Sequence, residues 1–326
     1  MSKKALITGI TGQDGSYLAE YLLELGYEVF GIVRRQSVTE NQDSRIFGLP
    51  VTALYGDLTD PLSTARIVRE VQPDEVYNLA AMSHVRVSFD VPAFTISTNA
   101  MGVLHVLESI RTEAPNARFY QASSSEMFGN SIDPDGYQRE STPMIPVSPY
   151  GCAKVMGYNL TRHYRAAYNM FACNGILFNH ESPRRGSNFV TQKVVKTAVQ
   201  IKLGLTNKLA LGNIDSQRDW GHSKDYVRAM HAMMNQESPD DFVISTGKTR
   251  SIRDLCEYTF NQLGLNYLDY VAYDAKYTRP EELNILRGDA SKAYRTLNWK
   301  PKISYEVMIQ EMIEEWLKVL SPTHAV

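Results

Sequence analysis

The chain has 326 residues, 43% of them hydrophobic and 21% charged, which suits one large or two modest globular domains with a substantial core. Its net charge of −2 gives no general basic field for nucleic acid. No apolar run approaches the roughly 18 residues of a membrane span, and no signal peptide precedes the first apolar segment. The three cysteines, Cys152, Cys173 and Cys256, form no disulfide or metal-binding pattern. We therefore expect a cytoplasmic protein with no metal, no membrane contact and no nucleic-acid partner.

The first expected element is a buried strand at residues 4–8, which leads into Gly9, Gly12 and Gly15 and then into a helical pattern at 17–23. Glycine lets the backbone turn sharply and approach a phosphate closely, and a helix N-terminus supplies N–H donors and a positive dipole end. An ordinary glycine-rich turn can show the same spacing. The order strand, turn and helix favours a site for a dinucleotide pyrophosphate.

The next expected strand, residues 28–33, ends in Arg34 and Arg35. Sites that prefer NAD usually place an acid here for the ribose 2′-hydroxyl, whereas an arginine accommodates the 2′-phosphate of NADP. Two adjacent arginines therefore favour NADP. The alternatives are a solvated basic loop or an arginine that contacts another subunit.

An alternation of strands and helices continues along the chain. After a polar, irregular segment at 36–44 we expect a strand at 51–55, a helix at 61–71, a strand at 75–81, a helix at 100–111 and a strand at 118–122. Asp57, just after the strand at 51–55, can meet an adenine ring. The strand at 75–81 ends in small residues that allow close approach to a cofactor. This βαβ alternation predicts an α/β fold, a Rossmann-type doubly wound parallel sheet.

Ser124 and Glu126 follow the strand at 118–122, and ligands of such sheets bind at the carboxyl ends of the strands. A serine there can hydrogen-bond a substrate hydroxyl that is being oxidised. A carboxylate two positions later can remove a carbon-bound proton and protonate a leaving hydroxyl. The alternative for Glu126 is a helix-start residue that satisfies backbone donors.

Tyr150 and Lys154 lie four residues apart at the start of a helical pattern, so both side chains share one helix face. A lysine beside a phenol is expected to lower the phenol's pKa from about 10, which makes the tyrosine a general base. The lysine can also bind the nicotinamide ribose. In isolation, such a pair is more often one core residue and one surface residue.

Beyond residue 180 the composition shifts to polar loops between shorter elements, and an apolar-periodic helix at 305–320 closes the chain. We predict an NADP-binding domain at 1–178, completed by part of 215–250. The remainder, 179–326, is predicted to be a smaller, interleaved α/β domain that binds the substrate.

Together these segments resemble the extended short-chain dehydrogenases/reductases, and specifically the GDP-mannose 4,6-dehydratase family, nearly end to end. The resemblance rests on the residues 9–15, 33–35, 77–81, 124–126 and 148–154. Its most specific segments are 175–186, which reads GILFNHESPRRG, and 218–221, which reads RDWG.

The resemblance implies a role for each matching position. Catalytic positions are Ser124, Glu126, Tyr150 and Lys154. NADP contacts are Gly9, Thr11, Gly12, Gln13, Asp14, Gly15, Arg34, Arg35, Asp57, Leu58, Leu79, Ala80, Ala81, Ser83, Tyr150, Lys154, His180 and Arg185. Contacts of the GDP-sugar are Ser83, Ser124, Glu126, Asn179, Val190, Lys193, Gly212, Asn213, Arg218, Arg279 and Glu282. Lysine and arginine suit an anionic diphosphate. Without the surrounding motifs, Arg218 and Arg279 would be interpreted as surface ion-pair residues, and His180 has a purely structural alternative.

The chain departs from the family's usual pattern at four positions. Ser124 stands where threonine is frequent, which loosens rotamer control because the β-branch is lost. Met82 stands for a frequent glutamine, Phe94 for a tyrosine and Asn99 for an aspartate. These changes leave a second substrate open, GDP-D-glycero-D-manno-heptose.

The implied reaction is an internal redox cycle on the sugar. Tyr150 takes the proton of the C4 hydroxyl while a hydride leaves C4, Glu126 removes the C5 proton and protonates the departing C6 hydroxyl, and the hydride returns to C6.

An epimerase or reductase would not need Glu126. A non-catalytic NADP-binding regulator would need none of Ser124, Tyr150 or Lys154. The family tendency is a homodimer or homotetramer in which the 35–44 loop reaches a neighbour's cofactor.

Overall fold

The computed structural model describes residues 2–35, 45–277 and 280–321, and the positions 36–44 and Arg279 singled out above lie outside this range. Its largest element is a seven-stranded sheet in the order β10-β6-β5-β4-β1-β2-β3, with every neighbouring pair parallel. The predicted Rossmann-type α/β fold is therefore confirmed. The strands of this sheet are β1 (Lys4–Thr8), β2 (Glu28–Val33), β3 (Val51–Tyr55), β4 (Glu75–Asn78), β5 (Arg118–Ser124), β6 (Ala172–Leu177) and β10 (Asp241–Ile244).

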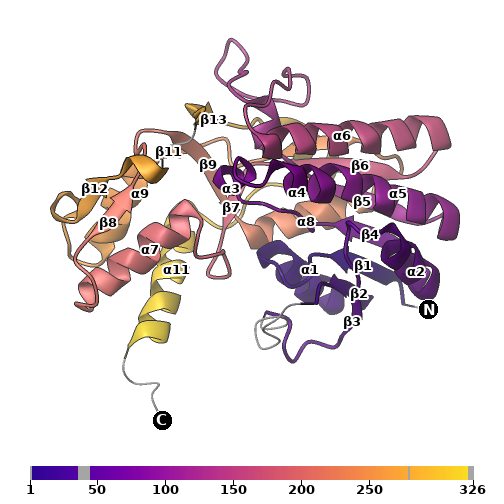
Figure 1. Ribbon diagram of the computed structural model, residues 1–326, viewed down its shortest axis with the longest axis horizontal. Helices are drawn as coiled ribbons and strands as arrows, with labels where there is room; N and C mark the ends of the chain where they lie inside the picture. Colours follow the sequence, from indigo (N-terminus) through magenta and orange to yellow (C-terminus); the bar gives the residue numbers. More distant parts are fainter. Residues whose placement is uncertain (1, 36–44, 278–279, 322–326) are drawn as a thin grey trace.

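Helices cover both faces of the sheet, as parallel strands require (Figure 1). On one face lie α1 (Gln13–Glu24) and α8 (Ser223–Met234). On the other lie α2 (Pro61–Val71), α5 (Gly102–Glu113) and α6 (Pro149–Tyr168). Because the crossovers all return to parallel strands, the carboxyl ends of β1 to β6 meet at one edge of the sheet.

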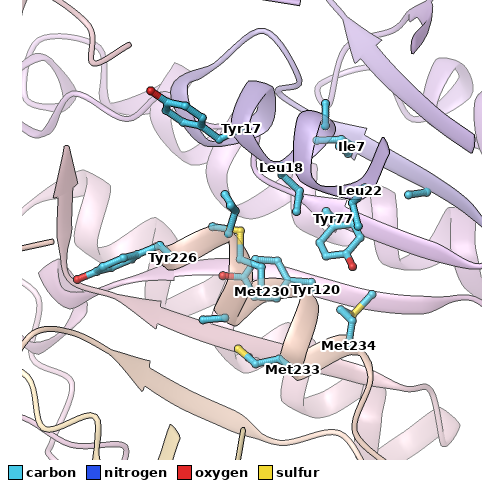
Figure 2. Close-up of a cluster of buried hydrophobic side chains, with 14 of the residues drawn as sticks. Ile7, Tyr17, Leu18, Leu22, Tyr77, Tyr120, Tyr226, Met230, Met233 and Met234 are labelled. Carbon is cyan, nitrogen blue, oxygen red and sulfur yellow. The ribbon is translucent and has the colours of Figure 1, made fainter. Parts of the chain in front are cut away.

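Figure 2 shows the core beneath α1 and α8. Leu18 and Leu22 of α1 point toward Tyr77 and Tyr120 of the sheet, and Met230, Met233 and Met234 of α8 fill the space beside them. All of these side chains are buried, so this layer holds α1, and with it the glycine turn that precedes α1, in a defined place against the sheet.

A second region lies beyond the sheet, on the left in Figure 1, and is built from α7 (Val190–Lys202), α9 (Ile252–Gln262) and α11 (Tyr305–Leu320). Their apolar faces pack together with Trp220 in a cluster of their own. Its strands are β7 (Asn179–Glu181), β8 (Leu209–Leu211), β9 (Gln217–His222), β11 (Thr249–Ser251), β12 (Val271–Tyr273) and β13 (Ile285–Leu286). Strands β11, β9 and β13 form one small sheet with β7 beside β9, and β12 pairs with β8.

Short elements complete the described chain: α3 (Val85–Ser88), α4 (Pro92–Ile96), α10 (Ser291–Leu297), the π-turn η2 (Ser97–Met101) and the 3-10 turns η3 (Ser125–Phe128), η4 (Tyr267–Asp269) and η5 (Ala275–Tyr277). No helix in the described ranges is long and apolar enough to cross a membrane.

Several element boundaries differ from the sequence prediction, and the early end of one strand has a visible side-chain cause. The strand expected at 75–81 ends at Asn78, because the amides of Leu79 and Ala80 donate to the Thr8 hydroxyl instead of continuing the ladder (3.1 and 3.0 Å). The helix expected at 100–111 runs from Gly102 to Glu113 and is preceded by the π-turn. π-turns inside helices are frequent at functional sites.

Candidate active site

The glycine turn between β1 and α1 is too tight for side chains. Gly9 has a φ of +70°, and a Cβ added to it would lie 2.9 Å from the Cα of Ala80. A Cβ on Gly15 would lie 2.2 Å from the carbonyl oxygen of Gly9. The turn therefore packs directly against the loop after β4 and leaves the first backbone N–H groups of α1 available to an anion.

A pocket of about 500 Å³ opens along this turn, at the carboxyl ends of β1, β2, β3 and β4. Most of the predicted cofactor residues line it: Gly9, Thr11, Gly12, Gln13, Asp14, Gly15, Arg34, Asp57, Leu58, Leu79, Ala80, Ala81, Ser83 and Arg185. Of the predicted cofactor contacts, Arg35, Tyr150, Lys154 and His180 are not part of this lining. Residues that line it without having been predicted as contacts include Arg45, Thr98, Arg184 and Phe189. The pocket lies at the carboxyl ends of the strands, which is where open α/β sheets bind their ligands.

A buried hydrogen-bond relay fixes the floor of this pocket. The Thr8 hydroxyl donates to Asn78 Oδ1 (2.7 Å), and Asn78 Nδ2 donates to Gln121 Oε1 (2.8 Å). The relay ties the ends of β1, β4 and β5 together. Since the same Thr8 oxygen accepts from the amides after β4, the backbone of Leu79 and Ala80 is held toward the glycine turn.

Two of the departures from the family pattern, Met82 and Asn99, meet directly in the structure. Asn99 accepts from the Met82 amide (2.8 Å) and donates to the Met82 carbonyl (2.9 Å). An amide side chain can do both, whereas an ionised aspartate can only accept. Asn99 therefore holds the loop around Met82, which lines the pocket, against the π-turn Ser97–Met101. The preceding residue, Thr98, lines the pocket, and its buried hydroxyl has no hydrogen-bond partner among the described residues.

The four candidate catalytic residues come from three adjoining elements, β5, η3 and α6. Ser124 ends β5 and caps η3 by accepting from the Glu126 amide (3.2 Å). Tyr150 and Lys154 lie in the first turns of α6, whose start is set by Ser148, which accepts from the Gly151 amide, and by Pro149 at the first helical position. A Cβ on Gly151 would lie 2.8 Å from the Glu126 carbonyl oxygen. Glycine at this position thus lets α6 pack against η3, which brings Tyr150 and Glu126 to the same side of the sheet.

The pKa of Tyr150 does not behave as the sequence suggested. Burial raises it to about 12, a hydrogen bond with Ser124 opposes the rise, and the charge of Glu126 adds to it. Lys154 does not lower it here, because its ammonium donates to the Ala122 carbonyl (2.8 Å) and lies 5.7 Å from the centre of the tyrosine ring. Burial lowers the pKa of Lys154 itself to about 8. The predicted depression of the phenol's pKa by the lysine is therefore wrong, since burial dominates the pKa of Tyr150.

His180 lies behind the pocket, in a buried ion pair with Asp14. Its Nε2 is 2.7 Å from Asp14 Oδ2, its Nδ1 is 2.7 Å from the Phe178 carbonyl oxygen, and its ring stacks on Tyr226. Both ring nitrogens face oxygen atoms that can accept hydrogen bonds, an arrangement that the protonated imidazole satisfies. Burial alone would lower the pKa of His180, but the charge of Asp14 and the hydrogen bond to it together outweigh burial and raise that pKa. His180 acts on the pocket through Asp14, which lines it.

Arg185 also lies next to this pair, but its immediate partner is Glu181. Its Nε is 3.0 Å from Glu181 Oε2, and its guanidinium lies 3.6 Å from the centre of the Phe189 ring. Phe189 caps the N-terminus of α7 and lines the pocket, so this stack connects the pocket to the second region.

The predicted GDP-sugar contacts lie mainly in the second region, on five segments. Asn179 begins β7 and pairs with Trp220 of β9, two positions after Arg218. Val190 begins α7, and Lys193 of the same helix donates to the Ala210 carbonyl (2.6 Å) and lies over the ring of Tyr277. Gly212 and Asn213 follow β8. Arg218 is buried and donates to the Leu283 carbonyl (3.0 Å), next to Glu282. Its surface ion-pair alternative therefore does not apply.

Comparison with known proteins agrees with this architecture. A family model described as GDP-mannose 4,6 dehydratase matches residues 6–312. The chain is 48% identical to GDP-mannose 4,6 dehydratase 1 of Arabidopsis thaliana, over 97% of this chain and 90% of that protein. It is 46% identical to the GDP-mannose 4,6-dehydratase of Yersinia enterocolitica, over 95% and 93%.

Among solved structures, a Thermotoga maritima UDP-glucose 4-epimerase with UDP-glucose superposes with a TM-score of 0.85 at 24% identity, over 98% of this chain and all of that chain. A Bacillus anthracis dTDP-glucose 4,6-dehydratase in complex with NAD gives 0.83 at 20%, over 98% and 97%. At these identities the structures show the shared fold. The sequence relatives and the nearly complete family match show more: the chain belongs to the GDP-mannose 4,6-dehydratase family.

Proposed function

We propose that the protein converts GDP-α-D-mannose to GDP-4-dehydro-6-deoxy-α-D-mannose and water, with NADP as a cofactor that is regenerated in each cycle. The observation that carries this proposal is the 45–48% identity to relatives named GDP-mannose 4,6 dehydratase over at least 95% of the chain. The arrangement of Ser124, Glu126, Tyr150 and Lys154 beside a dinucleotide-type pocket supports it, because dehydration needs a carboxylate in addition to the tyrosine and lysine.

The pocket residues suit a dinucleotide. The positions where a Cβ would collide, Gly9 and Gly15, are those where a pyrophosphate must approach the backbone closely. Arg34 lines the pocket at the end of β2, where an arginine accommodates a 2′-phosphate. When bound, the nicotinamide would accept a hydride from the sugar and later return it.

Within this proposal each catalytic side chain has one task. Ser124 orients the C4 hydroxyl by a hydrogen bond, and Tyr150 takes the proton of that hydroxyl as the hydride leaves C4. The C4 ketone acidifies the C5 hydrogen, which Glu126 removes. Glu126 then protonates the C6 hydroxyl as it departs as water. The hydride returns to C6, and a proton returns to C5.

Tyr150 needs help to lose its own proton, because its pKa is about 12 in the buried site. A positive charge nearby favours the phenolate. Lys154 by itself does not lower this pKa, whereas the oxidised nicotinamide ring would bring such a charge when bound. The phenolate is therefore expected only with oxidised cofactor in place, which would couple the activation of Tyr150 to cofactor binding.

The second region is proposed to hold the GDP moiety. Lys193 and Arg218 already donate to backbone carbonyls, which fixes where their cationic groups lie. Lysine and arginine groups of this kind suit the charge of a diphosphate.

The direct test is to incubate the protein with GDP-mannose and to look for the 4-keto, 6-deoxy product by NMR. An epimerase would return a C4 epimer without loss of water, and a non-catalytic regulator would return the substrate unchanged. GDP-D-glycero-D-manno-heptose should be run in parallel, and a higher kcat/KM for it would reassign the substrate within the same reaction.

A further inference from the structure

The protein has a second hollow, of about 620 Å³, whose lining among the described residues includes none of the predicted cofactor or sugar contacts. Three segments form most of this lining: 245–248, which follows β10, 287–291, which follows β13 and begins α10, and 299–301, which precedes α11. We call this hollow the β10 groove. Since β10 belongs to the main sheet and β13 to the small sheet, the groove lies where the two regions meet.

Arg287 is the half-buried cation of the β10 groove. Its Nε donates to the Gly247 carbonyl (3.1 Å), and its Nη2 donates to the Tyr137 hydroxyl (2.6 Å). Both acceptors are uncharged, so these contacts fix where the guanidinium lies without neutralising it. Its Nη1 makes no hydrogen bond to any part of the chain that the structure describes. The guanidinium is therefore held in place with donors to spare.

Positive charge is in excess around the β10 groove. Lys248 and Lys300 line it as well, and among the described residues no carboxylate forms an ion pair with either lysine or with Arg287. Asp289 is the acidic residue of the described lining, and it is already paired with Arg139 (2.8 Å). A concave surface with unbalanced cations attracts an anionic ligand.

One wall of the β10 groove also holds a polar group without a partner. Ser245 lines the groove and is buried, and its hydroxyl has no hydrogen-bond partner among the described residues. Buried polar groups are normally paired, so an unpaired one beside cations points to a ligand. The loop that follows is fixed, because Asp219 accepts from the amides of Thr246 and Gly247 (2.8 and 2.7 Å) and from the Thr246 hydroxyl (2.6 Å).

We propose that the β10 groove is a binding site for a small phosphorylated molecule, in which Arg287 and Lys248 hold the phosphate and the Ser245 hydroxyl donates to it. Arginine binds phosphate through parallel N–H groups, and a hydroxyl can add a further donor. The volume of the groove lies within the range of small-molecule sites, about 300–1,000 Å³, so the molecule that carries the phosphate has room as well. This site does not depend on the reaction proposed above.

The test measures binding of pyrophosphate to the full chain by calorimetry, with NADP at saturation to keep the glycine turn occupied. Dissociation constants are compared for the unaltered chain, Arg287→Gln and Lys248→Gln, at an ionic strength fixed with sodium chloride. Arg295→Gln is the matched control, because Arg295 is an exposed residue of α10 that does not line the groove. Melting temperatures check folding, and Lys248 is exposed, so its variant keeps the test decisive if Arg287→Gln unfolds.

Arg287→Gln should weaken pyrophosphate binding by about tenfold or more, as the loss of a charge-assisted contact does. Lys248→Gln should weaken it by about threefold, as expected for an exposed charge pair. Arg295→Gln should stay within about twofold of the unaltered chain, since it keeps every group of the site. Pyrophosphate that binds elsewhere is insensitive to both groove variants, so unchanged affinity in both would overturn the inference. An equal loss in Arg295→Gln, or no binding to the unaltered chain, would overturn it as well.

Discussion

The Asp14–His180 pair should make folding stability depend on pH in a defined direction. Because the folded protein raises the pKa of His180 above its ordinary 6.5, the stabilisation is complete below about pH 6.5 and is lost as the pH rises through the raised value. Burial would raise the pKa of Asp14, but the charge of His180, the hydrogen bond to it and the charge of Arg185 together lower that pKa, so the contribution of Asp14 is complete above 3.8 and is lost as the pH falls. The pair is therefore strongest between about pH 4 and about pH 6.5.

The size of the effect follows from burial. The two side chains are only 11% and 22% exposed, so the pair is little screened by solvent. Removing one member of a buried ion pair costs about 3–5 kcal/mol, and the partial exposure places Asp14→Asn near the lower value, about 3 kcal/mol at pH 6. Above pH 6.5 the difference between the unaltered chain and Asp14→Asn should shrink, by at most about 1.4 kcal/mol per pH unit, because one proton is involved.

The assay is urea unfolding of both proteins from about pH 5 to about pH 9, with equal nucleotide occupancy. Glu20→Gln is the matched control. It removes a carboxylate from the same helix, one that pairs with Arg184 and not with a histidine, so its effect should not change over this range. A constant difference between Asp14→Asn and the unaltered chain, or one that grows toward high pH, would refute a protonated His180.

Three further predictions concern the chemistry and the cofactor turn. Glu126→Gln should keep the fold and cofactor affinity but lower kcat by about 100-fold or more, with loss of C5 proton exchange with solvent, and near-normal turnover would remove Glu126 from its role. With GDP-mannose deuterated at C4 and unlabelled NADP, the deuterium should appear at C6 of the product by NMR, whereas deuterium in free NADPH would indicate a simple dehydrogenase. Gly15→Ala should weaken NADP binding by more than about tenfold, because its Cβ would lie 2.2 Å from the Gly9 carbonyl oxygen and the turn must shift. An unchanged dissociation constant for NADP in Gly15→Ala would show that cofactor binding does not depend on the observed shape of the turn.

Much of the secondary structure could be predicted because it depends on nearby residues. The strands at 28–33 and 51–55 and the helices at 61–71 and 305–320 have the predicted bounds. The start of the helix at Pro61 illustrates the reason: Asp60 caps it by accepting from two backbone amides, and proline favours the first helical position. The glycine turn was recognised for the same reason, since the strand, turn and helix that form it are contiguous.

The second region was harder to predict. Its helices α7 and α9 were not identified individually, and its small sheets join strands such as β7 and β9 that lie far apart in the chain. Pairing of that kind depends on which segments the fold brings together, and a short strand has too little pattern of its own to reveal it. The division into domains at residues 178 and 179, and the roles of the sugar-binding residues, stay predictions.

The sequence alone determined which chemical groups are present, in which order, and which local elements carry them: the glycine turn, the serine and carboxylate after β5, and the tyrosine and lysine on one helix face. Only the tertiary structure decided how those groups behave. It raised the pKa of Tyr150 by burial, joined Asp14 to His180 across 166 positions, clamped Met82 with Asn99, and placed Arg45 on the pocket wall and left Arg35 off it. The physical reason is that desolvation and electrostatic interaction depend on distance in space, which the chain acquires only when it folds.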